Sequence, residues 1–154
     1  MTNYIVRKPT QEDVEYLIDH IRPEDAAELD ALDGSTVRES LDETPDLLDN
    51  SQVWEVDGRV VAIFGVTPMS GPMKVGIIWM LATDEFHKNV RKFARYCKEV
   101  FKKMIKGYGY VFNYIHAKNT VSIEWLKWLG FEILEGRPLG HQGEIFHKFE
   151  MRNL

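Results

Sequence analysis

Apolar residues recur at helical spacing near the N-terminus. After a short strand over residues 4–8, Thr10 can cap a helix whose apolar positions lie three or four residues apart, namely Val14, Leu17, Ile18 and Ile21. A second helix is predicted over 23–32, because proline fits the first turn of a helix. A third helix, capped by Ser35, is predicted to stop before Pro45.

The middle of the chain predicts a hairpin followed by a buried strand. Residues 52–56 and 59–66 flank Asp57-Gly58, a dipeptide that tolerates the positive φ angles of a two-residue turn. The run 74–82 is apolar at successive positions, which is typical of a strand covered on both faces. We expect this strand at the centre of the sheet, between the hairpin and a later strand.

The second half predicts a long helix and three more strands. The helix covers 85–106 and carries its apolar residues on one stripe. Strands are expected over 110–116, 131–135 and 144–151, with a short helix between the first two. The element order is β-α-α-(α)-β-β-β-α-β-α-β-β, which predicts an α/β (α+β) fold with a mixed sheet.

Length and composition favour one domain over residues 1–154. A chain of 154 residues, 44% of them hydrophobic, can bury roughly two thirds of the surface that its unfolded form exposes. The apolar runs are far shorter than the ~20 residues that a membrane span needs, and no N-terminal signal is visible. The single Cys97 excludes an internal disulfide and fits a reducing compartment, so a cytoplasmic location is expected.

The net charge of -5 is distributed unevenly. Residues 10–50 contain fourteen Asp or Glu, whereas residues 87–106 contain eight Lys or Arg against one Glu. The basic helix could attract phosphates or a nucleic acid, or the two regions could be ordinary solvated helix faces. The overall acidity argues against nucleic acid as a partner.

The segment from Asn119 to Phe131 carries a recognisable motif. Asn119 can cap a helix, Gly130 can close it in the left-handed conformation, and Phe131 starts a strand. The order of an Asn, a small residue three positions later, Ile123 and a final Leu-Gly-Phe resembles the last conserved motif of the GCN5-related N-acetyltransferases. The element order resembles the fold of that family along nearly the whole chain.

The resemblance implies acetyl-CoA as cofactor and an amine or a protein as acceptor. In the family the cofactor lies where the central strand and the strand after the long helix diverge, and pantetheine would here pair with the main chain near Met80, Leu81 and Thr83. The pyrophosphate would lie on the first turn of the long helix, where unpaired amides favour an anion. Further cofactor contacts are expected from His87, Lys88, Asn89, Arg91, Lys92 and Asn119.

The chain departs from the family at its phosphate loop. The family uses Arg/Gln-x-x-Gly-x-Gly/Ala, because glycine lets the backbone approach the phosphates closely. Here His87 takes the first position, and Val90 and Lys92 stand where the small residues belong. The basic side chains nearby could hold a phosphate as point charges, or could simply be a solvated helix face.

The expected acid and base are also missing. Many family members have a tyrosine that protonates the departing thiolate, and Leu126 stands at that position. Residues 74–82 contain no carboxylate that could act as a base. His116, at a strand end facing the expected opening, is a weak candidate for the base, although a lone histidine is more often structural.

Other side chains offer less chemistry. His141 and His147 lack further ligands at metal-binding spacing, so no metal site is expected. Cys97 lies on the buried stripe of the basic helix and should be inert. Trp125 and Trp128 extend the apolar surface of the short helix, which predicts either burial within the fold or a protein partner.

A second resemblance concerns biology. The basic helix, the strand 110–116, Asn119-Thr120 and Leu129-Gly130 together resemble small acetyltransferase-like proteins encoded among the virion-assembly genes of short-tailed bacteriophages. Two functions follow: a GNAT-like N-acetyltransferase divergent in its pyrophosphate loop, or a catalytically silent GNAT-fold protein of virion assembly or host interaction. The phage resemblance implies the host cytoplasm or the virion as location, and it leaves enzymatic activity open.

Overall fold

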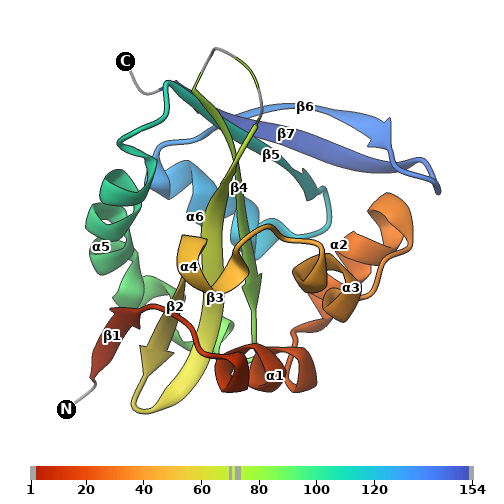
Figure 1. Ribbon diagram of the computed structural model, residues 1–154. Helices are drawn as coiled ribbons and strands as arrows, with labels where there is room; N and C mark the ends of the chain where they lie inside the picture. The colour runs from red at the N-terminus through yellow and green to blue at the C-terminus, as the bar shows by residue number, and fades with distance from the viewer. Residues whose placement is uncertain (1–2, 70, 72–73, 153–154) are drawn as a thin grey trace.

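A mixed sheet forms the centre of the molecule (Figure 1). The computed structural model describes residues 3–69, 71 and 74–152, with the side chains of Lys92, Phe93 and Arg95 outside that description. These residues form a seven-stranded sheet in the order β1-β2-β3-β4-β5-β7-β6. Its strands are β1 (Tyr4–Arg7), β2 (Ser51–Val56), β3 (Arg59–Pro68), β4 (Val75–Ala82), β5 (Tyr110–His116), β6 (Glu132–Leu139) and β7 (Glu144–Arg152).

The helices cover both faces of this sheet. They are α1 (Gln11–Asp19), α2 (Pro23–Asp33), α3 (Val37–Asp42), α4 (Leu47–Asn50), α5 (Phe86–Ile105) and α6 (Thr120–Leu129). Helices α1 and α3 pack on one face of β2 and β3, whereas α5 and α6 pack on the other face (Figure 1). Among the described residues, no helix combines the length and apolar character that crossing a membrane requires.

The predicted α+β fold and element order are confirmed, with local corrections near the N-terminus. Helix α1 ends at Asp19, so Ile21 lies beyond it and forms an isolated antiparallel bridge with Thr83. Thr36, rather than Ser35, caps α3, because its side chain accepts from the Glu39 main chain. The added short helix α4 follows Asp46, whose φ of 49° starts a new turn after the end of α3.

The predicted hairpin and central strand are both present. Asp57 and Gly58 have φ angles of 49° and 81°, as the two-residue turn between β2 and β3 requires. Strand β4 pairs with β3 in the antiparallel and with β5 in the parallel direction. Gly76 pairs with Val111 within the parallel stretch, and a Cβ at that position would overlap the side chains of Val66 and Tyr108.

Candidate functional site

Strands β4 and β5 diverge after a short paired stretch. Their register runs from Val75↔Tyr110 to Ile77↔Phe112 and ends there. Just beyond, the Asn113 side chain donates a hydrogen bond of 2.6 Å to the Ile78 carbonyl, in place of a further main-chain bond between the strands. We call the opening past this point the strand gap. The divergence that the family resemblance implies is therefore present.

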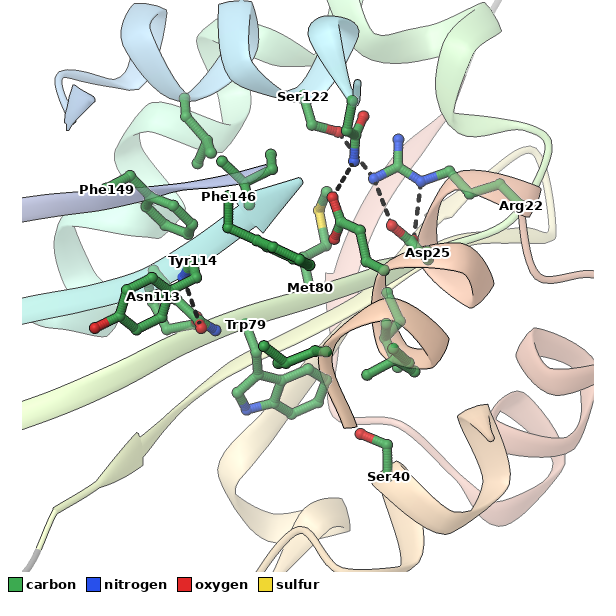
Figure 2. A pocket seen from close by; sticks show the side chains of 18 of the residues that line it. Arg22, Asp25, Ser40, Trp79, Met80, Asn113, Tyr114, Ser122, Phe146 and Phe149 are labelled. Atoms are coloured by element: carbon green, nitrogen blue, oxygen red, sulfur yellow. Dashed lines mark hydrogen bonds and ion pairs between the residues drawn. The ribbon is translucent and has the colours of Figure 1, made fainter. Parts of the chain in front are cut away.

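A cavity of about 200 Å³ lies in the strand gap (Figure 2). Its wall is built by α2 and α3, by the second half of β4, by β5 and β7, and by α6. Met80, Leu81 and Asn119 are the predicted cofactor residues that line this main cavity. A smaller apolar cavity of about 50 Å³ on the α5 side shares Met80 and Trp125 with it.

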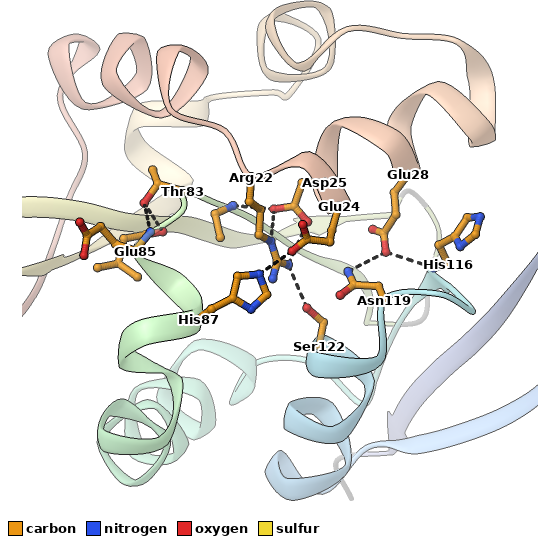
Figure 3. A network of polar contacts seen from close by, with 12 residues as sticks. Arg22, Glu24, Asp25, Glu28, Thr83, Glu85, His87, His116, Asn119 and Ser122 are labelled. Carbon is orange, nitrogen blue, oxygen red and sulfur yellow. Dashed lines mark hydrogen bonds and ion pairs between the residues drawn. The ribbon is translucent and has the colours of Figure 1, made fainter.

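Polar residues of α2 and α6 meet across the main cavity (Figure 3). On each helix these residues recur every three positions and so lie on one face. They are Arg22, Asp25 and Glu28 at α2, and Asn119, Ser122 and Trp125 at α6. Arg22 Nη2 donates to Ser122 Oγ at 2.9 Å, and Asn119 Nδ2 donates to Glu28 Oε1 at 2.9 Å. These bonds connect two helices that lie far apart in the sequence.

Glu28 is one of two carboxylates lining the main cavity, with Asp25, that the sequence did not single out. Its Oε1 also accepts from the His116 main-chain N–H at 3.2 Å, whereas Oε2 has no hydrogen-bond partner among the described residues. Burial raises the pKa of Glu28 to about 7. The nearby charge of Asp25 also raises this pKa, whereas the hydrogen bond from Asn119 lowers it. A carboxylate with such a pKa can take and release a proton near neutral pH.

The imidazole of His116 does not fit the role of base. Its Nδ1 accepts from the Lys118 main-chain N–H at 3.1 Å, so Nε2 carries the proton and donates to Glu144 Oε1 at 2.8 Å. The residue is buried, and its ring holds the end of β5 against the start of β7. Only its main chain reaches Glu28, which makes His116 a positioning residue for that carboxylate.

The exposed main chain of β4 is shorter than the resemblance implies. Arg22 N–H donates to the Ala82 carbonyl at 2.9 Å, and Ala82 N–H donates to Asp25 Oδ2 at 2.7 Å. Thr83 turns toward β3, since its N–H bonds the Val61 carbonyl at 2.8 Å. Thr83 therefore does not present its N–H to the strand gap, and its role as a cofactor contact stays a prediction. Alternation along the strand leaves Met80 with its N–H and C=O toward the strand gap.

The remaining predicted cofactor residues gather at the start of α5, outside the main cavity. His87 Nε2 lies 2.5 Å from Glu24 Oε2, and Asn89 Nδ2 donates to the Glu85 carbonyl at 2.8 Å. The side chains of Lys88 and Arg91 are exposed, whereas the side chain of Lys92 falls outside the described part of the chain. The carboxylates of Glu24 and Glu85 and the absence of glycine make this turn a poor match to the family's phosphate loop.

Three buried polar atoms in the wall of the main cavity lack hydrogen-bond partners among the described residues. They are Arg22 Nη1, Asn119 Oδ1 and Trp125 Nε1. Each unpaired buried group costs roughly 1–3 kcal/mol, and folded proteins rarely leave one unsatisfied. The wall therefore presents two donors and one acceptor that a polar ligand could satisfy. Asn119 does not cap α6 through its side chain, contrary to expectation, because its amide is turned toward Glu28.

The two tryptophans of α6 lie in different surroundings. Trp125 lines both cavities and contacts the Phe86 ring edge-on, with ring centroids 5.6 Å apart. Trp128 is 43% exposed and has the Lys98 ammonium 4.9 Å from its ring centroid. A protein partner at Trp128 stays a prediction.

Other reactive groups contribute little to the site. Burial raises the pKa of the Cys97 thiol, so a thiolate is disfavoured there. In the described part of the chain, no group of three or more His, Cys, Asp or Glu side chains is arranged to hold a metal ion.

Similarity to known proteins is visible in the structure rather than in the sequence. No protein-family model matches the sequence, and the curated proteins give no match. An Ard1 protein of Thermoplasma volcanium has a similar structure, with a TM-score of 0.68 and 18% identity over 98% of both chains. A ribosomal-protein-alanine N-acetyltransferase of Brucella melitensis has a TM-score of 0.65 and 15% identity over 97% of this chain and 99% of that one. The YncA protein of Salmonella typhimurium, solved with its cofactor acetyl-CoA, has a TM-score of 0.67 and 14% identity over 97% of this chain and 93% of its own. The chain has the fold of the GCN5-related N-acetyltransferases.

Proposed function

We propose that the protein is an N-acetyltransferase that takes its acyl group from acyl-CoA bound in the strand gap. The observation that carries the proposal is the end of the β4–β5 pairing at Ile77↔Phe112, with the main cavity directly beyond it. The fold, the free main-chain groups of Met80 and the unpartnered polar atoms of the wall support the same conclusion.

The residues present suit one end of the cofactor better than the other. The main chain of Met80, together with Asn119 and Trp125, could pair with the amide groups of a narrow acyl-bearing arm. The phosphates would be held by the charges of Lys88 and Arg91, without a glycine loop. When bound, acyl-CoA supplies a thioester carbonyl as the electrophile. Because point charges on an exposed helix face hold phosphate weakly, we expect low affinity.

Thermal unfolding with acetyl-CoA tests this proposal directly. A ligand that binds only the folded state adds about 2.7 kcal/mol of stability at a hundred times its dissociation constant. We expect stabilisation at millimolar acetyl-CoA that weakens in Asn119→Ala, with release of free thiol when amines are added. Asp30→Asn, an exposed change on α2, serves as the control. Absence of both stabilisation and thiol release at millimolar cofactor would contradict the proposal.

Two observations favour a second candidate, a catalytically silent GNAT-fold protein. The main chain of Arg22 and the carboxylate of Asp25 occupy the edge of β4 at Ala82, and Leu126 lines the main cavity where many relatives have a tyrosine. A role in virion assembly or host interaction rests on the sequence resemblance alone. The same titration separates the candidates, because a silent protein would neither be stabilised by acetyl-CoA nor release thiol from it.

A further inference from the structure

We infer that Glu28 is the catalytic residue that binds the acceptor amine and takes its proton, and that the acceptor is a slender alkylammonium such as a lysine side chain. The inference rests on the proposed function, because it names the acceptor end of the same site. It assigns a role to a residue that no sequence motif marks.

The carboxylate of Glu28 is held in one orientation. The Asn119 amide and the His116 main-chain N–H come from two different elements and both donate to Oε1. This leaves Oε2 without a partner among the described residues, although Glu28 lines the main cavity. An anchored carboxylate with one free oxygen is suited to receive a hydrogen bond from a ligand.

The charges around Glu28 compensate its carboxylate only in part. On α2, Asp25 is paired with Arg22 through two bonds of 2.9 Å, so that neighbouring cation is already engaged. At the end of β5, the His116 ring is turned to Glu144. The cavity residues contributed by α3, β4, β7 and α6 carry no charge. A cation is the ligand that would balance the one unpaired carboxylate lining the main cavity.

The neighbouring rings and the size of the space narrow the class of cation. Trp79 and Tyr114 line the main cavity, and aromatic faces attract an ammonium group. The volume of about 200 Å³ is below the roughly 300–1,000 Å³ of pockets that hold drug-sized ligands. An unbranched alkyl chain ending in an ammonium group fits these limits better than a bulky polycyclic amine.

The reaction at this end balances with the groups present. The ammonium gives one proton to the Glu28 carboxylate, whose pKa of about 7 suits this transfer near neutral pH. The neutral nitrogen then forms a bond to the acyl carbon while the carbon–sulfur bond breaks. The sulfur takes the second nitrogen proton, and Glu28 releases its own to solvent. Ammonium and thioester thus become amide, thiol and one proton.

Binding of n-butylammonium tests the first half without any cofactor. With carboxyl-labelled glutamate, we expect the Glu28 resonance to titrate near pH 7 and its midpoint to fall when butylammonium is added, because a cation favours the charged form. Glu28→Gln, which keeps an acceptor for Asn119, should weaken butylammonium binding at least tenfold. Asp30→Asn should bind it normally. An unchanged Glu28 resonance with butylammonium would overturn the inference.

Acetyl transfer to butylamine tests the second half. We expect Glu28→Gln to lower kcat by roughly 10²–10⁴ and to remove the acidic limb of the pH–rate profile near pH 7. Full activity with an unchanged acidic limb in Glu28→Gln would refute the role of Glu28 while leaving the proposed function intact. Conversely, a wild-type protein that binds butylammonium at Glu28 but transfers no acetyl group would refute the proposed function and the proton-transfer role, leaving only the amine site. Equal melting temperatures of variant and wild type at pH 5 exclude unfolding as the cause of any loss.

Discussion

The two ends of the α2–α6 contact contain the same kind of side chain in opposite states. At one end the carboxylate of Asp25 is 2% exposed and receives two bonds from Arg22 and one from the Ala82 main chain. At the other end, the carboxylate of Glu28 receives only neutral donors and keeps one oxygen free. Two acids three residues apart on one helix thus differ in whether a cation is hydrogen-bonded to the carboxylate.

This difference separates a structural carboxylate from a reactive one. A buried acid with a fixed cationic partner holds elements together and has no oxygen left for a ligand. Burial raises the pKa of both carboxyls, but the half-buried Glu28 has only neutral donors and keeps an unmet charge when ionised, which is the property that a base needs. The Arg22–Asp25 pair therefore belongs to the fold, and Glu28 belongs to the proposed chemistry.

The largest expected effect on stability comes from removing Asp25, the carboxylate partner of Arg22. Asp25→Ala leaves a buried guanidinium without its carboxylate, and breaking a buried pair in this way costs roughly 3–5 kcal/mol. Urea unfolding would measure the loss in the free energy of unfolding. The double variant Arg22→Met/Asp25→Leu should recover much of it, because no charge is then buried alone. A loss below about 1 kcal/mol in Asp25→Ala would show that the pair does not anchor α2.

The next effect is the pH dependence of stability that Glu28 produces. Its pKa in the folded protein, about 7, lies above the ordinary value of 4.5, so the folded state holds the proton more tightly than the unfolded state does. The stabilising contribution is complete below pH 4.5 and is lost as the pH rises through 7. At 1.36 kcal/mol per pKa unit, it amounts to about 3 kcal/mol.

The difference between wild type and Glu28→Gln isolates this contribution. Denaturant unfolding at pH 4.5 and pH 8 should show the wild type losing about 3 kcal/mol more than the variant over that interval. Identical pH dependence in the two proteins would mean that Glu28 titrates normally, and its assignment as the base near neutral pH would then lack support.

Local sequence patterns were enough to predict most of the fold. The Asp57-Gly58 turn needs two positive φ angles that few dipeptides adopt, and an apolar run such as 74–82 fits a strand covered on both faces. Both signals depend on neighbouring residues only. Ile21 shows the limit, because its helical spacing fitted α1, whereas a contact with Thr83 places it in a bridge.

The reactive end of the site depends on contacts that no local pattern contains. Glu28 belongs to a run of acids that is typical of a solvated helix face. Its hydrogen-bond partners His116 and Asn119 lie 88 and 91 residues away along the sequence. Its three-residue spacing from Asp25 and Arg22 was the available signal. The sequence could not show which of these acids would be buried or which would have a cation beside it.

A smaller effect is expected when Glu28 loses a neutral donor. In Asn119→Leu the hydrogen bond to Oε1 disappears, and because this bond favours the ionised form, the pKa of Glu28 should rise above its wild-type value. The loss of stability should be about 1 kcal/mol, typical of one hydrogen bond. Titration of the labelled Glu28 carboxyl measures the shift. A fall in the pKa would indicate that the donor had not been supporting the charged state.

The smallest effect should come from a third acid of α2, which pairs with a partner at the surface. Glu24 Oε2 contacts His87 Nε2, but the two side chains are 34% and 39% exposed, so solvent screens the interaction. Glu24→Gln should therefore change the free energy of unfolding by less than about 1 kcal/mol. Urea unfolding of Glu24→Gln and Asp25→Ala, at low and at high salt, measures the two changes in the free energy of unfolding. If both substitutions cost the same, burial would not be what distinguishes the acids of α2, and a shared loss of helix charge would explain the two results.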